Sequence, residues 1–149
     1  MNKRAVQSAS AEMAIPTHGG TYVLVLACHR AGRLPVGRLG MVPLQPGFYA
    51  YVGSAFGPGG LAARLQHHRQ MAARPHWHID FLRTRCELVE IWFTTEACRC
   101  EHAWAKALAG LPGARMPMPG FGASDCNCNA HLFWFGRKPS LGTFCRRVR

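Results

Sequence analysis

A nearly unbroken apolar run at residues 21–27, Thr-Tyr-Val-Leu-Val-Leu-Ala, constrains the fold of this chain more than any other feature. Its β-branched and aromatic side chains favour a strand. A strand covered on one face only would alternate apolar and polar residues, and this run does not alternate. We therefore predict a strand that packs against other parts of the chain on both of its faces.

Turn residues and hydrophobic periodicity predict the other elements. A turn at Pro46-Gly47 introduces a second strong strand, and the turn at residues 57–60 precedes a helix. Residues 36–44 look extended, but Pro43 and two glycines make them an edge hairpin at best. Residues 116–130 are expected to form a loop. The further elements expected are strands at residues 48–53, 88–95 and 131–135, and helices at residues 61–73, 75–82 and 96–109.

A chain of 149 residues suits one domain and can bury a core of its own. Residues 1–19 are small and polar, and we expect them to be a disordered leader. Residues 20–136 should form the folded domain, and residues 137–149 a basic, loosely held tail. The predicted elements include both strands and helices.

The charge balance points to a polyanionic partner. The chain has 18 Lys and Arg against 7 Asp and Glu, a formal net charge of +11, and arginine outnumbers lysine. The planar guanidinium matches phosphate with two hydrogen bonds, which favours nucleic acid. An acidic small ligand or a membrane surface is an alternative, and coding bias explains the arginine excess but not the net charge.

Compartment and membrane contact can be judged from apolar runs and cysteines. No apolar run is long enough to cross a bilayer, and residues 1–14 lack the apolar core of a signal peptide. Seven cysteines are an odd number, and nothing in the sequence points to export. We expect reduced cysteines, a cytoplasmic location and no membrane partner.

Glu101 is the most informative acidic residue. On the predicted helix at 96–109 its neighbours at helical spacing are largely apolar, so the carboxylate should point inward. A buried carboxylate needs a partner, which can be an arginine in a structural salt bridge or a metal ion. The helical neighbours are Ala97, Cys98, Trp104, Ala105 and Leu108.

Two tyrosines and an arginine precede Glu101. Tyr22 and Tyr51 lie on the two strongest predicted strands, and both phenols reach one end of the sheet if these strands pair. A phenol can orient or deprotonate a water, although tyrosines on strands more often serve in packing. Tyr49 shares a face with Tyr51. Arg64 lies at the edge of the buried stripe of its helix, and the alternative for it is a solvated basic face.

In this order, Gly20-Thr21-Tyr22, Tyr51-Val52-Gly53-Ser54, Arg64 and Glu101 resemble the motifs of the GIY-YIG nuclease superfamily. Over residues 20–135, finer features are similar to the small Uri-type endonuclease branch. Those features are residues 49–55 (Tyr-Ala-Tyr-Val-Gly-Ser-Ala), residues 76–80 (His-Trp-His-Ile-Asp), and residues 120–128 followed by His131-Leu132-Phe133. The spacer between the two tyrosines is longer than in most of the superfamily.

The resemblance implies an α+β fold, with a small three-stranded antiparallel sheet flanked by helices and an extended insertion between the first two core strands. It implies that Tyr22 and Tyr51 position or activate the attacking water, and that Arg64 stabilises the charge on the phosphate. It implies that Glu101 holds one Mg²⁺ or Mn²⁺. His68, one turn beyond Arg64, could relay a proton.

Further residues are candidates for contacts with the substrate. These candidates are Gly53, Ser54, Arg69, His76, His78 and Asp125, and Asp80 belongs to the same segment as the two histidines. Cys126, Cys128 and His131 could hold Zn²⁺, with Cys98, Cys100 or His76 as a fourth ligand. Their C-x-C-x-x-H spacing differs from that of a zinc finger, so a tight loop without zinc is the favoured interpretation.

The sequence therefore predicts a metal-dependent endonuclease that hydrolyses phosphodiester bonds in DNA, with RNA left open, and that serves repair or the processing of structured DNA. The alternative is a non-catalytic nucleic-acid-binding module that is an accessory to a DNA-repair enzyme. The complete set of Tyr22, Tyr51, Arg64 and Glu101 favours the enzyme, because a binding module needs no inward carboxylate.

Overall fold

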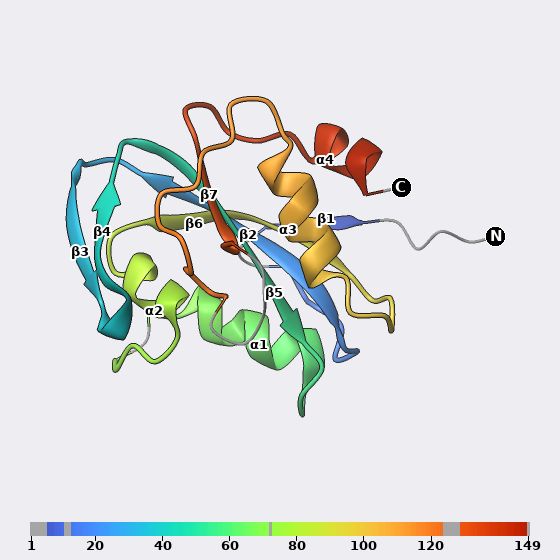
Figure 1. The fold of residues 1–149 in the computed structure, drawn as a ribbon. Coiled ribbons are helices and arrows are strands. Elements are labelled where there is room, and N and C mark those ends of the chain that lie inside the picture. Colours follow the sequence, from blue (N-terminus) through green and yellow to red (C-terminus); the bar gives the residue numbers. More distant parts are fainter. Residues whose placement is uncertain (1–5, 11–12, 72, 124–128, 149) are drawn as a thin grey trace.

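The computed structural model describes residues 6–10, 13–71, 73–123 and 129–148. Its main sheet has five antiparallel strands in the order β1-β6-β2-β5-β7 (Figure 1). The strands are β1 (Gln7–Ala9), β2 (Gly20–Cys28), β5 (Gly47–Ala55), β6 (Glu87–Thr94) and β7 (Leu132–Phe135), and a separate hairpin is formed by β3 (Gly32–Val36) and β4 (Gly40–Leu44). The helices are the 3-10 turn η1 (Gly37–Leu39), α1 (Gly60–Arg69), α2 (His78–Arg83), α3 (Glu101–Ala109) and α4 (Leu141–Arg147).

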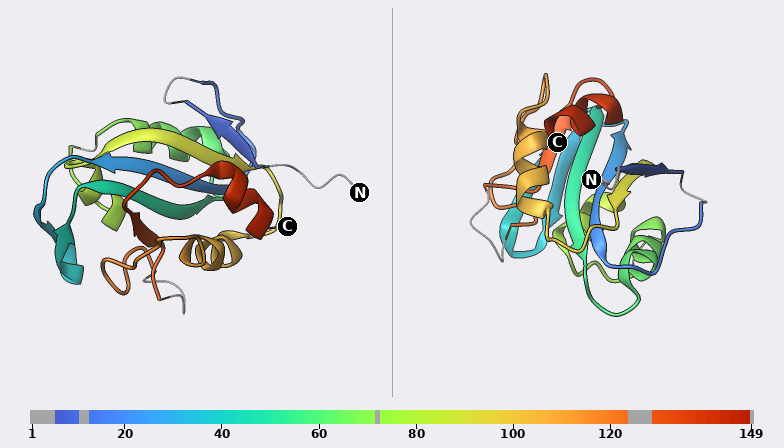
Figure 2. Two further views of the ribbon diagram at one scale, coloured as in Figure 1. Left: turned by 90° about the horizontal axis from the view of Figure 1, so that it is seen from above. Right: turned by 90° about the vertical axis from the view of Figure 1, so that its right-hand side faces the viewer.

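Strand β2 is the centre of the sheet, as its apolar run predicts. Every residue of β2 is buried, and β2 pairs with β5 on one side and with β6 on the other. Its alternate side chains enter two separate apolar cores, one on each face of the sheet. This arrangement gives a three-layer molecule with helices on both faces (Figure 2).

The two faces carry different helices. Tyr22, Leu24 and Leu26 of β2 enter the core formed with α1, α2 and the β3–β4 hairpin. Val23 and Val25 enter the opposite core, formed with α3 and α4. Figure 2 shows α1 and α3 on opposite sides of the sheet. A residue of α3 can therefore meet a residue of the α1 face only around an edge or an end of the sheet.

Helix α1 begins where a glycine turn lets the preceding chain come close. The backbone N–H groups of Leu61 and Ala62 donate to the carbonyls of His18 and Pro16, at 2.9 Å each. These bonds satisfy donors that the first turn of a helix leaves unpaired. At Gly60, φ is +58°, and a Cβ atom would lie 2.1 Å from the carbonyl oxygen of Thr17, so no larger residue fits.

The sheet is larger than the predicted three strands, and the difference comes from both ends of the chain. Strand β1 lies within the segment expected to be a disordered leader and pairs with β6, with Gln7 opposite Phe93. Strand β7, expected as residues 131–135, extends the other edge by pairing with β5. Residues 7–9 carry no apolar alternation, so only the free edge of β6 determines that they form a strand.

The expected insertion between the first two core strands is a hairpin that spans residues 32–44 rather than 36–44. Its inward side chains, Leu34, Val36, Val42 and Leu44, are buried in the core that contains α2. Pro35 and Pro43 lie on the exposed side of the two strands. The hairpin forms its own small sheet of two edge strands, a position that tolerates proline although proline cannot donate a ladder hydrogen bond.

Two helices begin later than periodicity predicts. Helix α2 starts at His78 rather than at Pro75, because the Asp80 carboxylate accepts the N–H groups of His76 and Trp77 and holds these residues outside the helix. Helix α3 starts at Glu101 rather than at residue 96, and the N–H of Cys100 donates to Thr21 Oγ1 at 3.3 Å. In the described part of the chain, no helix has the length and apolarity needed to span a bilayer.

The basic tail ends in helix α4, whereas the sequence predicts a loosely held segment. Phe144 on α4 is fully buried between Trp92 of β6 and Trp104 of α3, with ring centroids 5.1 Å away in both cases. Ser140 caps the helix by accepting the N–H of Thr143. One aromatic residue in a basic segment is a weak signal, and the groove that receives it exists only in the folded protein.

Replacing Phe144 with alanine should lower the free energy of unfolding by about 3–5 kcal/mol, because it leaves a large cavity between two tryptophans. Chemical denaturation followed by tryptophan fluorescence measures the change. Arg146→Ala on the exposed side of α4 is the control and should change stability by less than about 0.5 kcal/mol. Equal stabilities of Phe144→Ala and the control would show that α4 is not docked.

Candidate functional site

An open cleft with a volume of about 640 Å³ lies at the end of β5. Its lining comes from both faces of the sheet, from α1, from the segment before α2, and from the start of α3. The lining residues are Tyr22, Tyr51, Gly53, Ser54, Arg64, His76, Trp77, His78, Arg99, Glu101, His102, Gly122 and His131. The cleft is strongly polar, and Glu101 is the only carboxylate among these residues.

The two tyrosines reach the cleft through the register of β2 and β5. Tyr22 lies opposite Gly53, and Tyr51 lies opposite Leu24, so the two phenols are diagonal neighbours on one face. A Cβ atom at position 53 would lie 2.5 Å from the hydroxyl oxygen of Tyr22. Glycine at this position therefore gives the Tyr22 ring its place over β5.

Glu101 reaches the same cleft around an open edge of the sheet. Strand β7 pairs with β5 only from Phe48 to Tyr51, and the last contact is the N–H of Val52 with the carbonyl of His131. Within the described residues, no strand pairs with this side of β5 beyond that point. The first turn of α3, which covers the opposite face, can therefore present Glu101 to the phenols.

Glu101 lies on the inward side of its helix, as its helical neighbours predict. Trp104, Ala105 and Leu108 form the buried stripe of this helix, and Glu101 lies half-buried at its N-terminal end. In the part of the chain that the structure describes, no ion pair joins Glu101 to an arginine. The alternative of a structural salt bridge to an arginine is therefore not what the structure shows.

Arg64 of α1 lies in the cleft and stacks on an aromatic ring. Its guanidinium carbon is 4.3 Å from the centre of the Trp77 ring. A stacked guanidinium keeps its N–H groups free at the edge, where they can meet an anion. Arg64 thus belongs to the cleft rather than to a solvated helix face.

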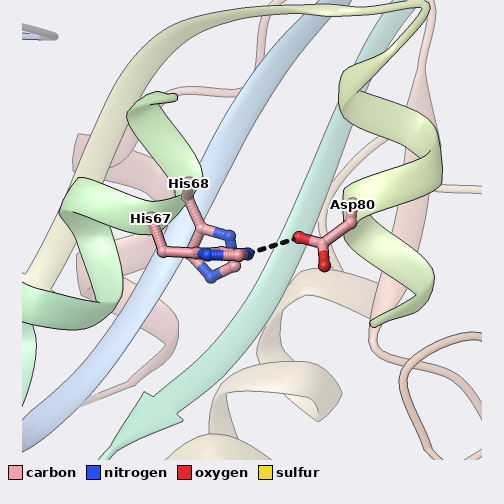
Figure 3. A group of neighbouring side chains, drawn as sticks. All are labelled: His67, His68 and Asp80. Atoms are coloured by element: carbon pink, nitrogen blue, oxygen red, sulfur yellow. Dashed lines mark hydrogen bonds and ion pairs between the residues drawn. The ribbon is translucent and has the colours of Figure 1, made fainter. Parts of the chain in front are cut away.

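Asp80 holds the segment that carries Trp77. It is 2% exposed, and its Oδ2 accepts the N–H groups of His76 and Trp77 at 2.9 and 3.0 Å. Its Oδ1 lies 2.8 Å from Nε2 of His67, and Figure 3 shows this contact between α1 and α2. Burial would raise the pKa of Asp80, but these hydrogen bonds from the backbone and from His67 lower it below its ordinary value. The ionised carboxylate therefore fixes the backbone of His76 and Trp77 and joins it to His67 on α1.

His68 lies behind Tyr22 and is 1% exposed. Its Nε2 is 2.7 Å from the hydroxyl oxygen of Tyr22, and its Nδ1 has no partner among the described residues. Burial, with His67 as the next cause, lowers the pKa of His68 to about 3, so its ring is neutral near pH 7. The sequence places His68 correctly one turn beyond Arg64, and the structure gives it contact with Tyr22 rather than with the open cleft.

Charges in the cleft act on both phenols. Burial raises the pKa of Tyr22 and of Tyr51 well above the ordinary value. For both residues Arg64 lowers the pKa and Glu101 raises it. The two charged groups are thus close enough to both hydroxyls to shift their ionisation. Both phenols are protonated near pH 7.

The loop before β7 closes one wall of the cleft. Nδ1 of His78 accepts the N–H of Gly122 at 2.8 Å, and the Phe121 ring lies edge-on to Tyr51 with centroids 6.2 Å apart. His131, considered above as a zinc ligand, is 4% exposed in this wall, and burial lowers its pKa. Its ring centre is 6.1 Å from that of His102.

The structure brings most of the expected residues together. Arg69 is an exception, because it donates to the carbonyls of Ser10 and Met13 and holds the N-terminal segment instead of lining the cleft. Tyr49 is fully buried, and its hydroxyl accepts the N–H of Gln45. Asp125, Cys126 and Cys128 lie outside the described residues. The expected residues that line the cleft are Tyr22, Tyr51, Gly53, Ser54, Arg64, His76, His78, Glu101 and His131.

Sequence reasoning missed Trp77, Arg99, His102 and Gly122 as lining residues. Trp77 could have been found from its place between two candidate histidines. Arg99 lies in the loop before α3, where no periodic pattern marks a side chain, and His102 is an exposed residue in the first turn of α3, off its apolar stripe. Gly122 belongs to the Gly-rich segment of the resemblance, where spacing says nothing about which residue faces the cleft.

The donor set suits a hard cation. A single carboxylate with room for water and phosphate oxygens is a common way in which proteins hold Mg²⁺ or Mn²⁺. Glu101 supplies that carboxylate, and the cleft supplies the room. The neighbouring imidazoles and guanidiniums add donors for an anion. The arrangement can hold a phosphate beside a cation and two neutral phenols.

One known protein family matches most of the chain, including the part that forms the cleft. Residues 21–148 match a family that is described as a domain of unknown function, DUF123. The chain belongs to the DUF123 family. The matched region of this DUF123 chain runs from the second residue of β2 to the residue after α4, and it includes every residue that lines the cleft. No curated protein and no solved structure matches the chain at a significant level.

Acid should destabilise this DUF123 chain through His68. Below about pH 6.5 the unfolded chain protonates this imidazole, while the folded chain does not until about pH 3. The contribution of neutral His68 to the free energy of unfolding is therefore fully present above about pH 6.5 and decreases as the pH falls from there toward about pH 3. Between about pH 7.5 and about pH 5 the decrease should be about 2 kcal/mol. Urea denaturation of the wild type and of His68→Gln at the two pH values measures the difference.

When the pH is lowered from about 7.5 to about 5, the free energy of unfolding of His68→Gln should fall by about 2 kcal/mol less than that of the wild type. His29→Gln is the matched control, because His29 is exposed, and it should keep the wild-type dependence on pH. Equal pH dependence of His68→Gln and the wild type would contradict the assignment of a neutral, buried His68.

Proposed function

We propose that this protein is a metal-dependent endonuclease of the GIY-YIG type, in its Uri-type branch, and that it hydrolyses phosphodiester bonds in DNA. The observation that supports the proposal most is that Tyr22, Tyr51, Arg64 and Glu101 line one cleft. These four residues come from two strands and two helices that lie on opposite faces of the sheet.

Charge supports a nucleic-acid substrate. The formal net charge of the chain is +11, and the cleft contains Arg64 and Arg99 against the single acid Glu101. Four histidines add further hydrogen-bonding groups to its wall. A phosphodiester is an anion whose oxygens accept such bonds, so binding is expected to weaken steeply with salt.

Tyr22 is suited to position the attacking water. Its phenol is protonated near pH 7, and Nε2 of neutral His68, 2.7 Å from the phenol oxygen, can accept a hydrogen bond from it. Because burial keeps the pKa of His68 low, this imidazole orients the phenol rather than taking its proton, and the phenol oxygen can accept a hydrogen bond from the water, whose proton leaves to solvent or to the leaving oxygen. Tyr51 lies diagonally beside Tyr22 and can orient the water or a phosphate oxygen.

Arg64 and Glu101 act on the phosphate itself. The Arg64 guanidinium, fixed on Trp77, can donate to the phosphate oxygens as negative charge builds up in the transition state. Glu101 can hold one Mg²⁺ or Mn²⁺, which when bound neutralises the leaving oxygen. The hydrogen bonds that Asp80 accepts from the backbone of His76 and Trp77 hold the Trp77 ring, on which Arg64 stacks, in place. The hydrolysis needs no covalent intermediate.

Repair or the processing of structured DNA is the proposed setting, in association with a DNA-repair enzyme. Within the residues that the structure describes, the helices form no helix-turn-helix that could read a base sequence. Selectivity would then come from the shape of the substrate, for example a flap or a branch. An assay therefore needs branched, flapped, single-stranded and duplex DNA, together with RNA of the same shapes.

Replacing Glu101 with glutamine should abolish cleavage that depends on Mg²⁺ or Mn²⁺ and leave DNA affinity nearly unchanged, because the amide keeps the shape but cannot balance a cation. Cleavage of this panel is measured with each ion and with EDTA, and affinity is measured by fluorescence anisotropy with Ca²⁺. Glu87→Gln, an exposed acid outside the cleft, is the control and should cut normally.

Two results of this experiment would count against the proposal. Undiminished cleavage by Glu101→Gln removes Glu101 from the mechanism. A wild-type protein that binds the panel tightly but cuts none of it with either ion favours the alternative of a non-catalytic binding module.

Arg64→Ala should lower the rate of cleavage at saturating DNA by about 10²–10³-fold, since one donor to a developing oxyanion contributes about 3–4 kcal/mol. Single-turnover kinetics separate this effect from binding. Arg115→Ala is a matched control, because the guanidinium carbon of Arg115 also lies over a tryptophan, 5.8 Å from the centre of the Trp134 ring, but Arg115 does not line the cleft. If the loss in Arg64→Ala is mainly in affinity, Arg64 only anchors the phosphate.

A further inference from the structure

The loop between β6 and α3 contains a cluster of metal-binding side chains that the proposed mechanism does not use. Glu96, Cys98 and Cys100 point their ligand atoms toward one another. The two sulfur atoms are 3.2 Å apart, and Oε2 of Glu96 lies 3.6 Å from Sγ of Cys98 and 3.7 Å from Sγ of Cys100. One carboxylate oxygen thus faces both thiols, and the three atoms form a small triangle.

The size of this triangle fits a tetrahedral zinc ion. Zinc bonds of about 2.3 Å to sulfur and about 2.0 Å to oxygen place two sulfurs about 3.8 Å apart, and a sulfur and an oxygen about 3.5 Å apart. The observed separations of 3.6 and 3.7 Å from sulfur to oxygen are close to that geometry, and the two sulfurs, 3.2 Å apart, need to separate by about 0.6 Å. All three ligand atoms can therefore reach one ion with small side-chain movements.

The backbone of this loop is tied to the central sheet. The N–H of Glu96 donates to Thr94 Oγ1 at 3.4 Å, and the N–H of Cys100 donates to Thr21 Oγ1 at 3.3 Å. Thr94 ends β6, and Thr21 is a buried residue of β2. The ligands at both ends of the cluster are thus fixed to rigid strands, and the side chain of Cys98 is exposed, so an ion can enter from solvent.

The ligand chemistry selects a different class of metal from that proposed for Glu101. Two thiolates and one carboxylate suit borderline ions such as Zn²⁺, whereas Mg²⁺ prefers oxygen alone. Among the described residues, no further histidine, cysteine, aspartate or glutamate joins this group. Three protein ligands leave the fourth tetrahedral position to water.

We propose that Glu96, Cys98 and Cys100 bind one Zn²⁺ on the surface of the protein, beside the cleft. Arg99 lies between the two cysteines, and Glu101 follows Cys100 directly. Both residues line the cleft, so the ion fixes the backbone that carries them. The site stands on its own geometry and does not require the protein to be a nuclease.

Cobalt is the probe for this site, because Co²⁺ replaces Zn²⁺ and a thiolate ligand gives it an intense charge-transfer band in the near ultraviolet. The reduced, metal-free full-length chain is titrated with Co²⁺ alone, and then Zn²⁺ is added. We expect one equivalent of Co²⁺ with the thiolate band and with the visible bands of a tetrahedral ion, and complete displacement by Zn²⁺. A wild-type chain that shows no thiolate band overturns the proposal.

Single substitutions assign the ligands. Cys98→Ser and Cys100→Ser should each lose most of the band, and Glu96→Gln should keep it while binding Co²⁺ more weakly. Cys145→Ser, on α4, is the matched control and should keep the band and the affinity. If Cys98→Ser and Cys100→Ser keep the band, and the double variant Cys126→Ser/Cys128→Ser loses it, the ion belongs to the loop before β7 and the proposal is wrong.

Two further measurements keep the result independent of folding and of activity. Far-ultraviolet circular dichroism shows whether each variant is folded. X-ray absorption at the zinc edge of the wild-type protein should give two sulfur neighbours at about 2.3 Å and two lighter ones at about 2.0 Å. A first shell without sulfur overturns the proposal even where a cysteine variant fails to fold.

Discussion

The burial of β2 on both faces is the constraint on which the rest of this structure depends. A fully buried central strand needs a partner on each edge and a layer of side chains on each face, and the chain supplies β5 and β6 at the edges. The two cores that result divide the helices between the two faces. Each residue of the candidate site is therefore attached to one face of the sheet and reaches the cleft from that face.

The cleft exists because the sheet is incomplete at one corner. Strand β7 stops opposite Tyr51, so β5 runs on without a partner on that edge in the described part of the chain. Residues from both layers meet there, and Ser54 and Gly53, which point to opposite faces, both line the cleft. A longer β7 would close this edge and separate Glu101 from the phenols.

The site combines neutral buried groups with fixed charges. Tyr22 and His68 form a hydrogen-bonded pair that burial keeps uncharged, while Arg64 and Glu101 act on the phenols from the cleft with opposite sign. Asp80 stays ionised because three hydrogen bonds outweigh its burial, and it fixes the segment of Trp77 without contacting the cleft itself. Rigid support of this kind holds a guanidinium where an anion can bind.

The sequence by itself determined the central strand, the strand at β5 and the order of the motif residues, because continuous apolar runs and glycine turns are local signals. It could not determine that residues 7–9 form an edge strand or that Phe144 docks the tail, since both depend on surfaces that form only on folding. Helical spacing predicted that Glu101 points inward, but it could not show which residues of other elements Glu101 meets. Only the tertiary structure decided that the carboxylate enters the cleft, because where β7 ends is a matter of strand pairing between distant segments rather than of local pattern.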